Sequence, residues 1–140
     1  MKRYLLDTSL LAAYLHNRPP AVTLIASWLQ HDEAVTSILV YGEVIEYLKG
    51  LSNYAEKYTK LHTILHEIPP YPLTYAILER YADIRRTLRP QHKDIGDIDS
   101  LIAATALEHN LTLVTIDHDF ERVPHLKLKL IDLKKTREAA

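Results

Sequence analysis

The sequence contains no cysteine, and only three of its 140 residues are glycine. Without cysteine, disulfides, thiolate zinc sites, iron–sulfur clusters and cysteine nucleophiles are all excluded. The glycines stand at positions 42, 50 and 96, too scattered for a phosphate-binding loop or a dinucleotide fingerprint. These absences exclude thiol chemistry and the common forms of nucleotide-cofactor chemistry.

Long apolar runs and a strong net charge are also missing. No apolar run approaches the ~18 residues of a membrane span, and the first residues, MKRYLLDTS, lack a signal-peptide pattern. The net charge is −1, so no global basic field indicates a nucleic-acid-binding protein. A content of 47% hydrophobic and 25% charged residues is typical of globular proteins. We therefore expect a single domain over residues 1–140 that is soluble, cytoplasmic and not bound to membranes.

Apolar periodicity and capping residues predict strands that alternate with helices. We expect strands at residues 3–6, 33–37, 112–116 and 127–131, and a plain connection where Pro69, Pro70 and Pro72 occur. Helices are expected at residues 8–16, 21–31, 40–49 and 98–109, between Thr74 and Pro90, and from a cap at Ser52 to His66. This alternation predicts an α/β fold, a three-layer α/β/α sandwich with a central parallel sheet.

Two aspartates come directly after predicted strands. Asp7 follows the first strand and Asp117 follows the strand TLVTI. Ligands of open parallel sheets bind beyond the carboxyl ends of the strands. Each acid alone also has a structural explanation, since Asp7 suits a helix cap and Asp117 suits a turn. Their shared place at one sheet edge favours a site.

Helical geometry separates the two glutamates of the segment YGEVIEY. At about 100° per residue, the apolar face of this helix centres on Val40, Val44 and Leu48. Glu43 borders that face and is expected to point into a crevice. Glu46 lies farther round the helix and is expected in solvent.

The same geometry separates the aspartates of GDIDSLIAATAL. Asp97 suits the N-cap of the following helix. Asp99 shares a stripe with Ile102, Ala103 and Ala106, so it is expected to point inward, where a carboxylate needs a partner or a metal ion. Residues two apart on a helix do not face one point, and we therefore prefer Asp99 as a site residue.

Four acids are thus expected to converge at one edge of the sheet: Asp7, Glu43, Asp99 and Asp117. Carboxylates gathered in this way repel one another and raise one another's pKa values unless a cation holds them. Oxygen ligands without thiolates suit Mg²⁺ or Mn²⁺. A site of this kind is typical of phosphoryl chemistry, in which metal ions activate water and neutralise the leaving oxygen.

Four segments carry a family resemblance: LLDTSLL (residues 5–11), TSILVYGEV (36–44), IGDIDSLIAATAL (95–107) and LVTIDHDF (113–120). In this order they resemble the PIN-domain ribonucleases, above all the VapC-type toxins of prokaryotic toxin–antitoxin pairs. The resemblance extends from about residue 3 to residue 131, and its specificity comes from the four motifs together, since each alone is weak.

The resemblance implies a PIN-like α/β/α sandwich and an endoribonuclease that depends on Mg²⁺ or Mn²⁺. It also implies a homodimer, an RNA substrate and a small antitoxin that blocks the site. The resemblance assigns the family's four acids to residues that the geometry already favours, Asp7, Glu43, Asp99 and Asp117. It also assigns two supporting hydroxyl groups, those of Ser9 and Thr115. Asp119 lies two residues beyond Asp117 and is the alternative for the fourth acid.

Basic residues gather between positions 80 and 93, just before the third motif. Arg85 and Arg89 are one helical turn apart and share a face, so we expect them to contact RNA phosphates. A solvated helix face is the simpler interpretation of such a charge run. His62 and His66 are also one turn apart, but the segment HTILH lacks the glutamate of a metalloprotease motif, and a surface pair is favoured.

Two other functions are considered. A phosphate-transfer receiver needs an acid two residues after the first one, where Ser9 stands. An aspartyl phosphatase needs an aspartate near mid-chain, and none lies between Glu43 and Asp83. The remaining alternative is a non-catalytic PIN-like module that binds RNA or a partner, which the four acids disfavour.

Overall fold

The computed structural model describes residues 1–133, and these build one parallel sheet with helices on both of its faces. The strand order is β3-β2-β1-β4-β5, and every neighbouring pair is parallel. The strands are β1 (Tyr4–Leu6), β2 (Ala34–Ser37), β3 (Pro70–Tyr71), β4 (Thr112–Thr115) and β5 (Leu128–Leu130).

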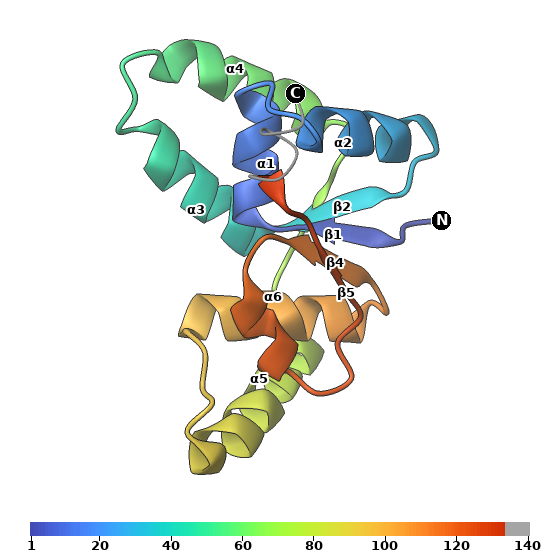
Figure 1. Cartoon of the computed structure of the whole chain (residues 1–140), viewed down its shortest axis with the longest axis vertical. Helices are drawn as coiled ribbons and strands as arrows, with labels where there is room; N and C mark the ends of the chain where they lie inside the picture. The colour runs from blue at the N-terminus through green and yellow to red at the C-terminus, as the bar shows by residue number, and fades with distance from the viewer. Residues whose placement is uncertain (134–140) are drawn as a thin grey trace.

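Figure 1 shows α1 to α4 on one side of the sheet and α5 and α6 on the other. The predicted three-layer α/β/α sandwich is therefore confirmed. The helices are α1 (Thr8–Leu15), α2 (Ala21–Gln30), α3 (Ile38–Leu48), α4 (Tyr54–Leu65), α5 (Tyr75–Leu88) and α6 (Asp97–Glu108), with short 3-10 helices η1 (Arg89–Gln91) and η2 (His118–Arg122). None of the helices in residues 1–133 is both long and apolar enough to cross a membrane.

The core lies around the two central strands. Leu5 and Leu6 of β1 and Leu113 and Val114 of β4 are fully buried, as expected for strands covered on both faces. Helix α6 is apolar on most sides and buries its alanines against the sheet. A rigid centre of this kind fixes the ends of β1 and β4, the two strands that Asp7 and Asp117 follow.

One strand was not predicted. The segment with three prolines was expected to be a plain connection, but Pro70 and Tyr71 pair with Thr36 and Ser37 as the edge strand β3. Proline has no amide hydrogen to donate, and an edge strand tolerates this loss because one side of it needs no partner. The sheet therefore has one strand more than the sequence indicates.

The expected cap at Ser52 is wrong. Helix α4 begins at Tyr54, and Asn53 precedes it without a side-chain hydrogen bond to the helix. Helix α4 packs against both α1 and α3, and most helix stability in proteins comes from such tertiary contacts and not from a cap.

Two lysines of α4 hold the C-terminal end of α1. The buried Lys57 donates from Nζ to the carbonyl oxygen of Leu15 at 2.8 Å. Lys60 donates to the Asn17 side chain at 2.7 Å and to carbonyls at the same helix end. Positive charge at a helix C-terminus satisfies its free carbonyls and complements the helix dipole. The lysines thereby fix α1, whose other end begins beside Asp7.

Candidate functional site: an acid-lined hollow at the sheet edge

Asp7 is buried where β1 ends and α1 begins. Its Oδ1 accepts a hydrogen bond from the amide of Thr8 at 2.8 Å, so the residue caps α1 as well. Its Oδ2 accepts from the hydroxyl of Thr115 on β4 at 2.6 Å. Asp7 therefore caps α1 and also belongs to the candidate site, because its two carboxylate oxygens have different partners.

Glu43 reaches the same place from α3. Its Oε1 accepts a hydrogen bond from the Thr8 hydroxyl at 2.5 Å, which joins α3 to the start of α1. Glu43 is half-buried, as its position beside the apolar face predicts. Glu46 is exposed, as expected, and it also lines the hollow. The hollow is wide enough for both helix positions to reach its wall.

Asp99 lies in the first turn of α6 and is half-buried. Asp97 does not cap this helix, because Gly96 holds the N-cap position and Asp97 is the first helical residue. The carboxylate of Asp97 turns instead to α5, where it forms an ion pair of 2.6 Å with Arg85 and accepts from the Tyr81 hydroxyl at 3.2 Å. The two aspartates therefore face different elements, as their spacing predicts.

The four predicted acids line one hollow of about 630 Å³. No lysine, arginine or histidine among residues 1–133 lines it. The lining consists of Asp7, Thr8, Ser9, Ala12, Glu43, Glu46, Tyr47, Asp99, Ile116 and Asp117.

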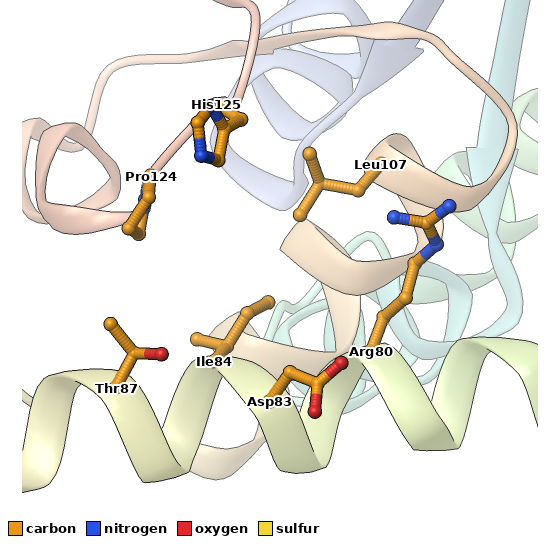
Figure 2. A pocket seen from close by; sticks show the side chains of 7 residues that line it. All are labelled: Arg80, Asp83, Ile84, Thr87, Leu107, Pro124 and His125. Carbon is orange, nitrogen blue, oxygen red and sulfur yellow. The ribbon is translucent and has the colours of Figure 1, made fainter.

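A smaller cavity of about 180 Å³ lies between α5, the end of α6 and the segment after η2. Figure 2 shows Ile84 and Leu107 beside this cavity and Asp83 on its rim, and no second acid among residues 1–133 lines it. The larger hollow differs from it by gathering several carboxylates without a cationic side chain of the described residues.

The carboxylates of the acid-lined hollow disturb one another's protonation. Burial, followed by repulsion from Asp7, Asp117, Glu43 and Asp119, raises the pKa of Asp99 to about 6. Burial also raises the pKa of Asp7, although its bonds to Thr115 and Thr8 oppose this shift. Raised carboxyl pKa values are typical of acids that lack a neutralising cation.

The donor chemistry of the hollow fits a hard divalent cation, since carboxylate and hydroxyl oxygens are the ligands that Mg²⁺ and Mn²⁺ prefer. In their present rotamers, however, no three histidine, aspartate or glutamate side chains of residues 1–133 lie close enough together to hold a metal ion. Hydrogen bonds explain the spread, because Glu43 is tied to Thr8 and Asp117 to the amide of Asp119. Binding of one ion by three or more of these side chains therefore requires side-chain rotation.

The supporting residues differ in where the structure places them. Thr115 is fully buried and orients Asp7, whereas Ser9 lines the hollow directly. Asp117 also lines the hollow. Asp119 is exposed, lies 3.4 Å from Arg122 and lines a neighbouring depression. Of the two candidates for the fourth acid, Asp117 is the one that the fold brings beside the other three.

The two arginines expected to contact RNA have different surroundings. Arg85 pairs with Asp97, and its guanidinium lies 5.8 Å from the ring centre of Tyr81. Arg89 is exposed and forms no ion pair within residues 1–133. Their contact with RNA stays a prediction, and Arg89 has the freer side chain. His62 binds the Tyr41 hydroxyl at 3.0 Å.

Two residues of the hollow were missed from the sequence as site residues. Thr8 was assigned only to the start of a helix, yet its hydroxyl binds Glu43. Tyr47 was not singled out from the sequence as a site residue, yet it lines the acid-lined hollow. The signal for both was present: Thr8 adjoins Asp7, and Tyr47 follows Glu43 by one helical turn.

Comparison with known proteins places this geometry in a family. The family model described as "PIN domain" matches residues 4–126. A curated relative, Ribonuclease VapC1 of Haemophilus influenzae strain R2866, is 28% identical over 126 residues, which is 89% of this chain and 94% of the relative.

Solved structures agree. VapBC-1 from nontypeable Haemophilus influenzae superposes with a TM-score of 0.77 at 27% identity, covering 91% of this chain and 96% of the other. VapBC2 from Rickettsia felis, bound to a promoter DNA fragment, gives a TM-score of 0.83 at 23% identity, covering 92% and 98%, and supports the fold alone. With the family model spanning most of its length, the chain belongs to the PIN-domain family.

Proposed function

We propose that the chain is an endoribonuclease that uses Mg²⁺ or Mn²⁺ to hydrolyse phosphodiester bonds at the acid-lined hollow. One observation carries the proposal: carboxylates from four separate parts of the fold line a space that no cationic side chain of residues 1–133 lines. Burial, and after it repulsion from the other acids of the hollow, raises the pKa of both Asp7 and Asp99. A cluster of carboxylates of this kind is more stable with a bound cation than without one.

In this proposal the ion is held by the four acids Asp7, Glu43, Asp99 and Asp117. When bound, a divalent ion supplies the charge that neutralises the scissile phosphate and lowers the pKa of the attacking water. The chain itself orients Asp7 through the Thr115 hydroxyl. Glu43 would exchange its bond to the Thr8 hydroxyl for the ion. Ser9 is placed to support the substrate or the ion from the start of α1.

RNA as the substrate is supported by the relatives. VapC1 of Haemophilus influenzae is named a ribonuclease, and this chain matches nearly the whole length of that protein. The alignment covers 94% of the relative's length, so the likeness is not limited to one part of that protein. An acid-lined hollow repels RNA without a metal ion, so the proposed activity and the proposed cofactor depend on each other.

The same resemblance supplies the proposed partners. VapC-type toxins pair with a small antitoxin that blocks the site, and the likeness to VapBC-1 supports this assignment. We assign the chain as the toxin of a type II toxin–antitoxin pair, acting as a homodimer on RNA in the cytoplasm.

The activity is tested with protein produced without its partner. Cellular RNA is incubated with the protein and Mg²⁺, Mn²⁺ or a chelator, and the new RNA 5′ ends are sequenced. We expect discrete cuts that require a divalent ion and stop in the chelator. RNA binding without cuts under every metal condition would contradict the enzyme and support the non-catalytic module.

A further inference from the structure

Tyr47 is an exposed aromatic residue at the wall of the acid-lined hollow. Its side chain lies one helical turn after Glu43 on α3, so the two share a face of the helix. It is 43% exposed and lines the same space as the four acids. An aromatic ring that remains in solvent beside four carboxylates contributes little to the core, and this calls for another role.

The ring of Tyr47 is held in place from α1. Its hydroxyl lies 2.8 Å from Nε2 of His16, and the two rings meet edge to face at 5.8 Å between centres. Burial and the nearby cations of Lys57, Arg18 and Lys60 lower the pKa of His16. The imidazole is therefore neutral near pH 7 and is able to accept the hydroxyl hydrogen.

His16 itself is the C-cap residue of α1. The other end of α1 begins at Asp7, and the lysines of α4 fix the end that carries His16. The ring of Tyr47 is thus connected through one short helix to the acids. This connection fixes the distance between an aromatic surface and the place proposed for the scissile phosphate.

Other tyrosines of this region have ring partners instead. Tyr58 packs on His62 at 4.3 Å between ring centres and on Tyr54 at 5.6 Å. Tyr41 binds His62 through its hydroxyl. Among residues 1–133, His16 is the single ring that Tyr47 contacts, and 43% of Tyr47 remains exposed to solvent.

Unpaired RNA offers a nucleobase beside every phosphate. Proteins recognise unpaired RNA by stacking its bases on aromatic side chains, and a single stack changes affinity by about tenfold. A duplex keeps its bases stacked on each other and offers none to such a ring.

We propose that Tyr47 stacks on an unpaired nucleobase next to the phosphate at the acid-lined hollow, and so selects single-stranded cleavage sites. The inference rests on the proposed ribonuclease activity and adds the residue that determines its preference for unpaired RNA. Tyr47 acts here as a specificity-determining residue, since the carboxylates remain the groups beside the reacting phosphate.

The test uses a short RNA that contains a mapped cleavage site, and variants of that RNA in which each flanking nucleotide is made abasic. The parent should lose about tenfold in kcat/KM when one particular flanking base is removed. Tyr47→Ala should lose a similar factor on the intact RNA and nothing further from removing that base. This non-additivity identifies the ring and the base as partners.

Two variants serve as controls. Tyr47→Phe keeps the ring and removes only the hydroxyl bond to His16, so its cleavage should stay within about threefold of the parent and keep the abasic penalty, since a stack depends on the ring face. Tyr75→Ala removes a tyrosine that is 88% exposed at the start of α5, outside the hollow, and should leave cleavage unchanged.

The proposal is overturned if Tyr47→Ala cuts the intact RNA as efficiently as the parent, or if its penalty for the abasic base equals that of the parent. If Tyr47→Ala does not fold, the parent alone decides, because a scan in which no flanking abasic site slows cleavage also overturns it. A parent that cuts no RNA with Mg²⁺ or Mn²⁺ contradicts the proposed function instead.

Discussion

The two sides of the first turn of α6 differ in how their carboxylates are compensated. On the side facing α5, Asp97 pairs with Arg85 and accepts from Tyr81. On the side facing the sheet edge, burial and then repulsion from other acids raise the pKa of Asp99 to about 6. The two residues are separated by a single isoleucine and have the same side chain.

This difference shows that the residue type alone does not decide the role of an acidic side chain. Its surroundings in the fold decide it. Asp97 is 67% exposed at its side chain and already has a cation within the chain, so it needs no ligand. The charged groups that shift the pKa of Asp99 are all carboxylates. Compensation has to come from outside the described chain, by a proton or by a bound cation.

The largest expected effect comes from Asp99→Asn. The variant should lower RNA cleavage at least ~100-fold, because even outer-shell partners of a metal ion change activity by 10–100-fold and this residue is a proposed ligand. Asp97→Asn is the matched control and should cut within about threefold of the parent, since surface ion pairs contribute little. Cleavage rates with Mg²⁺ check both. Parent-like cleavage by Asp99→Asn would contradict the site assignment.

The next effect concerns metal binding. Mg²⁺ should raise the melting temperature of the parent, because a ligand at about 100 times its Kd stabilises the native state by about 2.7 kcal/mol. Asp117→Asn should show a much smaller rise. Thermal melts with and without Mg²⁺ measure the shifts. Equal shifts in both proteins would place the ion elsewhere.

Without metal, the pH dependence of stability should distinguish the two aspartates. The folded protein binds the Asp99 proton more tightly than the unfolded chain, whose pKa is near 3.8. Stability should therefore fall as pH rises from 3.8 to about 6, and the loss is complete above that pH. Asn does not titrate, so the advantage of Asp99→Asn over the parent should grow through this window and then level off.

Urea unfolding in a chelator, at several pH values, measures this advantage. Asp97→Asn is again the control, because it removes the partner of Arg85 and should lower stability rather than raise it. An Asp99→Asn advantage that is constant from pH 4 to pH 7 would contradict the raised pKa of Asp99.

The smallest effect separates the two arginines. Arg89→Ala should reduce the slope of log affinity for RNA against log salt by about 1, the loss of one phosphate contact. Arg85→Ala should change the slope less, because its guanidinium is held by Asp97. Binding titrations at several salt concentrations test this. An unchanged slope in the double variant would show that this basic segment does not contact the RNA backbone.

The strand ends were predictable because a parallel sheet gathers carboxyl ends at one edge. Asp7 and Asp117 follow short apolar strands, and this pattern alone placed both beside the hollow. Glu43 and Asp99 followed from helical phase, since each borders the apolar face of its helix. The apolar periodicity of helices and the order of strands and helices can be read from a sequence, and they predicted the positions of these four acids.

Contacts between distant segments were not predictable in the same way. Arg85 was expected to be free for RNA, and nothing in its neighbourhood along the chain indicates that Asp97 pairs with it. The bond between Thr8 and Glu43 joins two helices whose packing the periodicity does not determine. Strand β3 forms because its proline-containing segment pairs with β2 at the edge of the sheet, where proline is tolerated.

The hydrogen bond between Thr115 and Asp7 also has a consequence for protein synthesis, since it joins residues 108 positions apart in the chain. Strand β1 occupies the middle of the sheet and must wait for β4 as its second neighbour. Pairing over such sequence separations forms late in folding. A growing chain on the ribosome therefore holds Asp7 long before it holds the threonine that orients it. The proposed nuclease site is therefore assembled only after β4 has been synthesised and has paired with β1.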